Sequence, residues 1–152
     1  MKHYVGTFSP VDVVLTAGTI SRGGNMAHPM KGCRVLIVED EYLVGDDLAN
    51  ALRSLGAHVI GPISQLAEAL AIHQDSFDVA VLDINLRGET SYLLADELMR
   101  IGKPFIFTTG YCADMIPHRF QDARRWEKPW QLEDVTTDIA RMCSQLQPPV
   151  AA

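Results

Sequence analysis

The sequence predicts a single α/β domain: one five-stranded parallel sheet, (βα)5 in order, with helices on both faces. Short apolar runs alternate along the chain with segments of helical periodicity, which is typical of consecutive βαβ units. The chain has 152 residues, 47% of them hydrophobic and 21% charged, which suits one globular core. Its net charge of −6 does not favour nucleic acid, because phosphate contacts need clustered Lys and Arg.

The predicted strands are short runs of branched and aromatic residues, and the last is the least apolar. They cover residues 33–38, 57–61, 77–83, 104–109 and 124–128. Helical spacing of apolar residues predicts helices over about 44–55, 64–72, 94–101 and 131–146. Gly56 is placed to end the first helix and Ser64 to cap the second. Residues 110–118 contain Pro117 and predict only a weak or short helix.

The ends of the chain differ from this regular middle. Residues 1–30 are rich in Gly and turn formers without a sustained period, so we expect a flexible extension. The domain is predicted over 31–147 and a short tail over 148–152. Only "QPPVAA" follows the last helix, which leaves no room for an output domain and favours a stand-alone protein.

Cysteine usage and hydropathy bear on the compartment. The cysteines are Cys33, Cys112 and Cys143, odd in number and without a CxxC pair, so we expect reduced thiols in a cytoplasmic protein. No run approaches the roughly 18 apolar residues of a membrane span, so no membrane association is expected.

Reactive side chains follow four of the five predicted strands. The first strand runs into Glu39 and Asp40, the third ends on Asp83, the fourth on Thr109 and the fifth on Lys128. The carboxyl ends of parallel strands share one edge, where ligands bind. Clustered carboxylates favour a hard cation such as Mg²⁺. With a Lys and a hydroxyl beside them, the set suits phosphoryl transfer to a carboxylate.

At this point the sequence resembles a known family. The stretches "IVEDE", "VLDINL", "FTTG" and "KPW" occur in the order and spacing of the receiver domain of two-component response regulators, over about residues 31–146. The stretch "FIFTTGY" also resembles the FAT-GUY branch, which consists mostly of stand-alone receivers. The resemblance implies a flavodoxin-like (βα)5 fold and a phosphoprotein of phosphorelay signal transduction.

The resemblance also implies the metal site. Asp83 would accept the phosphoryl group and, with Asp40, ligate Mg²⁺ directly. Glu39 would act through water, and Asn85 would contribute its backbone carbonyl. Glu41 we assign only to the start of the following helix.

The remaining implied roles concern response to the phosphate. Lys128 would pair first with Asp83 and then with the phosphate, and the Lys128–Pro129 bond is expected to be cis. Thr109 would turn to hydrogen-bond a phosphoryl oxygen. The predicted switch region contains Thr109, Gly110, Tyr111, Arg125 and Trp126.

Two positions depart from the family pattern. Many receivers carry an aromatic residue where this chain has Arg125, so the usual coupling to Thr109 is altered. Trp126 should face the other side of the strand, and Arg125 is interpreted as a surface ion-pairing residue. Arg87 stands where many receivers have Pro, and the "RGE" turn still permits the chain to reverse.

The predicted function is a single-domain response regulator, not a conventional enzyme. It would accept its phosphoryl group from a sensor histidine kinase or a histidine phosphotransfer protein. Its output would be contact with a downstream protein, with a homodimer possible. Three alternatives stay open: a phosphate-independent interaction module, a Mg²⁺-dependent aspartyl phosphatase, and a fragment of a hybrid kinase. The phosphatase is disfavoured because Asn85 stands where such enzymes carry a second Asp.

Overall fold

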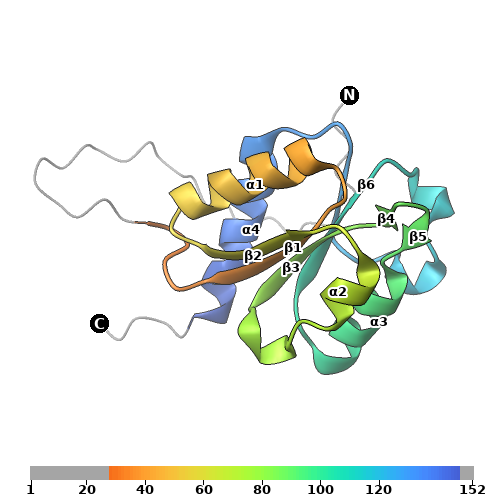
Figure 1. The fold of residues 1–152 in the computed structure, drawn as a ribbon, viewed down its shortest axis with the longest axis horizontal. Helices are drawn as coiled ribbons and strands as arrows, with labels where there is room; N and C mark the ends of the chain where they lie inside the picture. The colour runs from red at the N-terminus through yellow and green to blue at the C-terminus, as the bar shows by residue number, and fades with distance from the viewer. Residues whose placement is uncertain (1–27, 148–152) are drawn as a thin grey trace, which may run out of the picture.

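The fold is a five-stranded parallel sheet covered by helices, as the sequence predicts. The computed structural model describes residues 28–147, so most of the predicted extension and the tail lie outside the described range. Neighbouring strands of the sheet run in the order β2-β1-β3-β6-β7, and every pair is parallel (Figure 1). The strands are β1 (Arg34–Val38), β2 (His58–Ile63), β3 (Val79–Asp83), β6 (Phe105–Thr109) and β7 (Arg125–Glu127).

Alternate residues of the central strands build two separate cores, one on each face of the sheet. Val35 and Ile37 of β1 face one core, which receives apolar side chains from α1 (Tyr42–Ser54) and α4 (Leu132–Leu146). Leu36 and Val38 face the other, which is filled from α2 (Leu66–Leu70) and α3 (Tyr92–Ile101). All four of these strand residues have no exposed surface, which confirms the predicted buried strand.

Two predicted helices are shorter than expected. The predicted helix over 64–72 reduces to α2, whose N-cap is Gln65 rather than Ser64 and lacks a side-chain capping bond. Residues 110–118 form no α-helix. They contain the 3₁₀ turn η2 (Ala113–Met115), and η3 (His118–Phe120) follows with Pro117 at its N-cap. Another 3₁₀ turn, η1 (Gln74–Ser76), precedes β3.

A small hairpin follows β3 and was not predicted as strands. It pairs β4 (Asn85–Leu86) with β5 (Glu89–Thr90) in antiparallel register. The two turn residues both have positive φ, 53° at Arg87 and 85° at Gly88, which is the backbone of a tight two-residue hairpin turn. The "RGE" stretch therefore reverses the chain, as expected, and does so beside the carboxyl end of β3.

The folded body begins before residue 31. Met30 has no exposed surface and belongs to the core shared with α1 and α4. Its backbone N–H donates to the carbonyl of Leu55 at 3.0 Å. Met30 is therefore an anchored core residue, while residues 1–27 of the predicted extension lie outside the described range.

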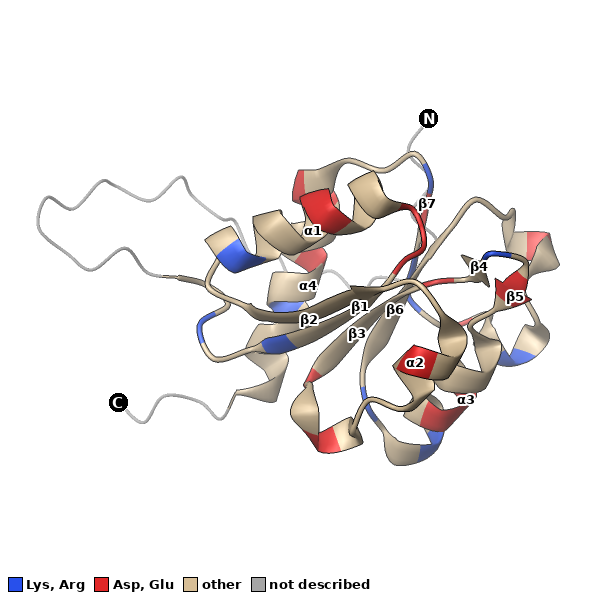
Figure 2. Ribbon diagram, viewed as in Figure 1, with Lys and Arg blue, Asp and Glu red and all other residues tan. Residues whose placement is uncertain are grey.

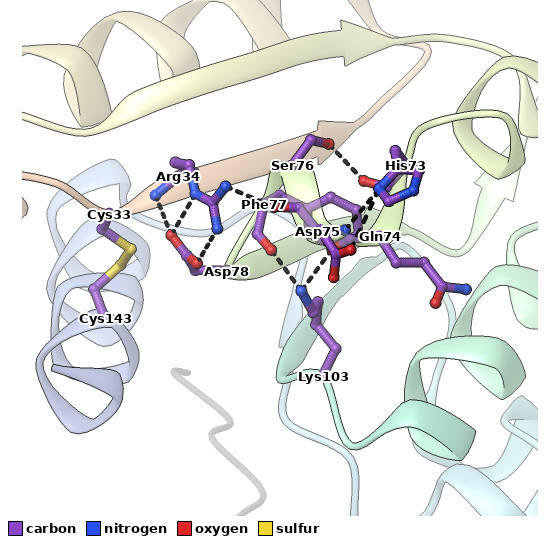
Figure 3. A network of polar contacts seen from close by, with 10 residues as sticks. All are labelled: Cys33, Arg34, His73, Gln74, Asp75, Ser76, Phe77, Asp78, Lys103 and Cys143. Atoms are coloured by element: carbon purple, nitrogen blue, oxygen red, sulfur yellow. Dashed lines mark hydrogen bonds and ion pairs between the residues drawn. A yellow bond between two sulfur atoms is a disulfide. The ribbon is translucent and has the colours of Figure 1, made fainter. Parts of the chain in front are cut away.

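Polar contacts tie together the amino-terminal edge of the sheet (Figure 3). Arg34, the first residue of β1, forms an ion pair with Asp78 just before β3, at 2.7 Å between Nη2 and Oδ1. The Lys103 ammonium, just before β6, donates to the carbonyls of Gln74 and Phe77 at 2.6 Å each. This edge is thus held by its own contacts, away from the carboxyl ends of the strands.

The prediction of reduced thiols is wrong for two of the cysteines. Cys33, directly before β1, and Cys143, in α4, form a disulfide whose Cα atoms are 5.9 Å apart (Figure 3). They are 110 residues apart in sequence, and the packing of α4 against α1 and β3 brings Cys143 to the start of β1. Sequence spacing gives no sign of such a pair. Cys112 is free and exposed.

Candidate functional site

The carboxyl ends of the central strands carry the acids that the sequence singled out. Glu39 follows β1 directly and Asp83 ends β3, and each residue is only 5% exposed. Figure 2 shows the acidic segment that connects β1 to α1 near the middle of the sheet edge. Two neighbouring parallel strands thus end in buried carboxylates, which is costly unless cations are present.

Among residues 28–147, a single ammonium group reaches these carboxylates. Lys128, one residue beyond β7, places its Nζ 3.1 Å from an oxygen of Glu39 and 3.1 Å from an oxygen of Asp83. The same Nζ lies 2.7 Å from Oε1 of Glu41, its shortest contact of the three. The structure therefore brings Glu39, Asp83 and Lys128 together as predicted, and adds a carboxylate that the sequence analysis assigned elsewhere.

Burial sets the protonation behaviour of the cluster. Loss of solvation raises the pKa of Glu39, and its hydrogen bond with Asp83 raises it further. Burial likewise raises the pKa of the Asp83 carboxyl, against the opposing effects of Glu39 and Lys128. Burial alone would lower the pKa of the Lys128 ammonium, but the hydrogen bond to Glu41 and the charges of Asp83 and Glu39 raise it. One ammonium does not neutralise the cluster.

The residues that are present fit a divalent metal ion. Among residues 28–147, Glu39, Glu41 and Asp83 each offer a carboxylate oxygen, and these oxygens lie within 4.8 Å of one another. The donors are all oxygen, and two of them belong to buried carboxylates with an incomplete counter-charge. Oxygen ligands of this kind suit Mg²⁺.

Two other predicted ligands are placed differently. The Asp40 carboxylate lies outside this group, and its Oδ2 accepts a hydrogen bond from the backbone N–H of Arg87 at 3.0 Å. The side-chain oxygen of Asn85 accepts from Gly88 N–H at 2.9 Å, while the backbone N–H of Asn85 donates to Oδ1 of Asp83 at 3.3 Å. Asp40 and Asn85 thus orient the hairpin beside Asp83, and their direct metal ligation stays a prediction.

Thr109 lies at the end of β6 with 1% of its surface exposed. Its hydroxyl oxygen accepts a hydrogen bond from Tyr111 N–H at 2.8 Å, across Gly110. Its carbonyl accepts from Lys128 N–H at 2.7 Å, so the backbones of the two predicted site residues are joined. The Lys128–Pro129 peptide bond is cis, as the resemblance implied.

Arg125 is not the surface ion-pairing residue that we expected. It is 4% exposed, and its Nη1 donates to the carbonyl of Gln121 at 3.1 Å, just after η3. Its Nε has no hydrogen-bond partner among the described residues. Trp126 contacts the core on the α1 and α4 face, and its indole N–H donates to the buried carboxylate of Asp138 at 3.1 Å. Trp126 thus faces α1 and α4, on the side of β7 opposite to Arg125, as the alternation of strand side chains predicts.

Sequence reasoning missed Glu41 as a member of the cluster. Glu41 is the N-cap residue of α1, but its side chain makes no capping hydrogen bond. Its carboxylate turns to Lys128 instead. The only signal available was its place as the third consecutive acid after the strand, which the usual preference for acids at a helix start explains equally well.

Fold and site together define a class. Numbered within the sheet alone, the strands lie in the order 2-1-3-4-5, the flavodoxin-like arrangement, and the acids follow the two strands at its switch point. A Lys at the end of the last strand completes a site for an anionic group beside a cation. In the part of the chain that the structure describes, no helix is long and apolar enough to cross a membrane.

Comparison with known proteins identifies the family, although no family model matches the sequence. SdrG from Sphingomonas melonis Fr1, known from a solution structure, is 37% identical over 72% of this chain and 95% of its own, with a TM-score of 0.63. The receiver domain of HemR from Leptospira biflexa shares the fold at 24% identity and a TM-score of 0.66, over 76% and 98% of the two chains. The chain belongs to the receiver-domain family of response regulators.

Two further proteins resemble this chain, the first in fold and the second in sequence. The response regulator PhyR from Brucella abortus aligns over 78% of this chain and 51% of its own, at 24% identity and a TM-score of 0.64. The uncharacterized transcriptional regulatory protein YbdJ of Bacillus subtilis (strain 168) is 36% identical over 80 residues. This match covers 51% of the chain and 35% of YbdJ, so the chain spans about a third of that curated relative.

Proposed function

We propose that this protein is a single-domain response regulator that accepts a phosphoryl group on Asp83 and signals by contact with another protein. One observation carries the proposal: the Asp83 carboxylate lies at a sheet edge between a second buried acid and the Lys128 ammonium. Of the predicted site acids, Asp83 is the one that ends a buried central strand, with both faces of the sheet covered.

The transfer step needs little from the protein besides position and charge. An oxygen of Asp83 attacks the phosphorus of a phosphohistidine, the new O–P bond forms and the N–P bond breaks. The histidine nitrogen keeps the electron pair and takes up a proton from water. Lys128 lies 3.1 Å from Oδ2 of Asp83 and is placed to stabilise the negative charge on the incoming group.

A bound Mg²⁺ would supply neutralisation of the phosphoryl oxygens. Asp83 and Glu39 are the residues that the geometry favours for holding it, and Asp40 and the Asn85 carbonyl complete the predicted set. SdrG has also been solved in a BeF3-activated conformation, and the response regulator TrrA from Thermotoga maritima in complex with Mg²⁺-BeF. Both lend support to a phosphoryl and metal site in the present chain.

The switch would start at Thr109. Its hydroxyl oxygen is engaged by Tyr111 N–H in the described state, so turning toward a phosphoryl oxygen changes the contacts of the Gly110–Tyr111 segment. Arg125 holds the carbonyl of Gln121 at the other end of the same connection. These two contacts lie at either end of the segment between β6 and β7, and they support the predicted switch region.

The proposed partners are a sensor histidine kinase or phosphotransfer protein as donor and a downstream protein as target. A homodimer is a further possible output, and the protein is not proposed to be a conventional enzyme. The proposal places it in the cytoplasm, where ATP is available to a kinase. The Cys33–Cys143 bond is compatible with that compartment because both sulfurs are buried and thiol exchange needs access.

The test is the intact mass of the protein after incubation with acetyl phosphate and Mg²⁺, followed by peptide mapping. One phosphoryl adduct on the peptide containing Asp83 is expected for wild type, and none for Asp83→Asn or in excess chelator. Asp78→Asn removes a half-buried carboxylate at the amino-terminal edge of the sheet, outside the site, and should keep the adduct. An adduct that persists in folded Asp83→Asn, or maps elsewhere, would refute the assignment.

A further inference from the structure

We propose that Glu41 is a positioning residue of this site, which holds the Lys128 ammonium in the unphosphorylated protein and opposes arrival of the phosphoryl group. The inference deepens the proposed function and rests on it. It concerns a residue whose position at the start of α1 would otherwise mark it as an ordinary helix-terminal acid.

The local backbone frees the Glu41 side chain for this role. Glu41 has the extended backbone of an N-cap, with φ −80° and ψ 104°, and its carbonyl accepts from Gly45 N–H to begin α1. Its N–H donates to Oε1 of Glu39 at 3.0 Å, which fixes the residue beside the buried acid. The carboxylate makes no cap bond and extends to Lys128 instead.

Glu41 and Asp83 compete for the same cation. The Lys128 Nζ lies 2.7 Å from Glu41 and 3.1 Å from Asp83. The side chain of Glu41 is 59% exposed, whereas that of Asp83 is 6% exposed. A phosphoryl group on Asp83 needs the ammonium for itself, so Lys128 must give up its contact with Glu41. The Glu41 charge also repels an anionic donor.

The same charge should act in the opposite direction on a metal ion. A carboxylate oxygen of Glu41 lies within 4.8 Å of oxygens of Glu39 and Asp83, so its charge attracts a dication to the cluster. Removing it is therefore expected to weaken Mg²⁺ binding while favouring phosphorylation. A residue that merely supported the helix would change both properties in the same direction through lost stability.

The test compares Glu41→Gln with Asp47→Asn. Asp47 is an exposed acid on the same helix, and within residues 28–147 the ion-pair partners of Lys128 are Glu39, Glu41 and Asp83. Mg²⁺ affinity is measured by amide chemical shifts, and the phosphorylation rate by intact mass with acetyl phosphate at Mg²⁺ saturating for each variant. For Glu41→Gln we expect Mg²⁺ binding about threefold weaker and phosphorylation about threefold faster, the size of a partly exposed ion pair. Asp47→Asn should match wild type in both, and Glu41→Asp should fall between.

A third readout separates this inference from the proposed function. In metal-free protein at a fixed neutral pH, the Nζ resonance of Lys128 should shift in Glu41→Gln relative to wild type, because the 2.7 Å contact with Glu41 is lost. An unchanged Nζ resonance and unchanged Mg²⁺ affinity would overturn the Glu41 inference even if Asp83 is phosphorylated normally. Failure of wild type to accept phosphate, with both shifts present, would refute the proposed function and leave the contact of Glu41 with Lys128 supported.

Discussion

Protonation of the buried Glu39 makes the stability of the metal-free protein depend on pH. Burial, followed by the hydrogen bond with Asp83, raises the pKa of Glu39 from its ordinary 4.5 to about 7 in the folded state. The folded protein therefore binds this proton more tightly than the unfolded chain does. The free energy of unfolding falls as pH rises through the window between these two values. A pKa shift of this size corresponds to about 3 kcal/mol of unfolding free energy. This free energy belongs to the Glu39–Asp83 pair as a whole, because the two acids titrate together.

Urea unfolding in excess chelator at pH 5 and pH 8 measures this difference. Wild type is expected to lose about 3 kcal/mol between the two pH values, while Glu39→Gln, which imitates the protonated acid, should lose much less. Mg²⁺ should restore wild type at pH 8, because it binds the ionised carboxylate, and should affect Glu39→Gln less. Asp47→Asn is the charge-matched control. A pH dependence of equal size in Glu39→Gln would refute the reasoning, because the titration would then belong to another group.

Two further predictions test the scaffold. Under oxidising, denaturing conditions only Cys112 should react with an alkylating reagent, and all three cysteines should react after reduction; replacing Cys33 or Cys143 by Ser should then cost about 2 to 4 kcal/mol of stability. Three alkylated thiols without reductant would contradict the disulfide. A Cβ at Gly45 would lie 2.9 Å from two carbons of the Pro62 ring, where α1 crosses β2. Gly45→Ala should therefore lower the unfolding free energy by about 1 kcal/mol despite its better helix propensity, and a rise in the urea midpoint would contradict the close contact.

Local pattern was sufficient to predict the fold and much of the site. The central strands are short β-branched runs whose residues are buried on both faces of the sheet. Such runs are typical of buried parallel strands, so these segments could be assigned as strands from the sequence. Because parallel strands end at one edge, the residues directly after them could be grouped without knowledge of the packing. That reasoning placed Glu39, Asp83 and Lys128 together, and the structure has Lys128 Nζ 3.1 Å from an oxygen of each acid.

The features that escaped prediction depend on three-dimensional contacts or on competing local rules. The Cys33–Cys143 pair forms because α4 packs against α1 and β3, next to the start of β1, and the separation of 110 residues carries no local signal. Glu41 fits the rule for helix-start acids, and only the reach of Lys128 from β7 reveals its other contact. Arg125 was expected at the surface because charged residues usually lie there, yet a backbone carbonyl partner permits its burial.

Lys128 couples the site to the predicted switch region through two different parts of the same residue. Its ammonium is shared among the carboxylates that follow β1 and β3, so its position depends on the charge at Asp83. The backbone N–H of Lys128 donates to the carbonyl of Thr109, and the hydroxyl oxygen of Thr109 accepts from Tyr111 N–H. A change of charge at Asp83 that moves the ammonium is therefore expected also to displace the Lys128 backbone and the Thr109 peptide that is hydrogen-bonded to it. Since the aromatic residue of many receivers is replaced here by a buried Arg125, we expect this backbone route to provide a connection that does not depend on an aromatic side chain.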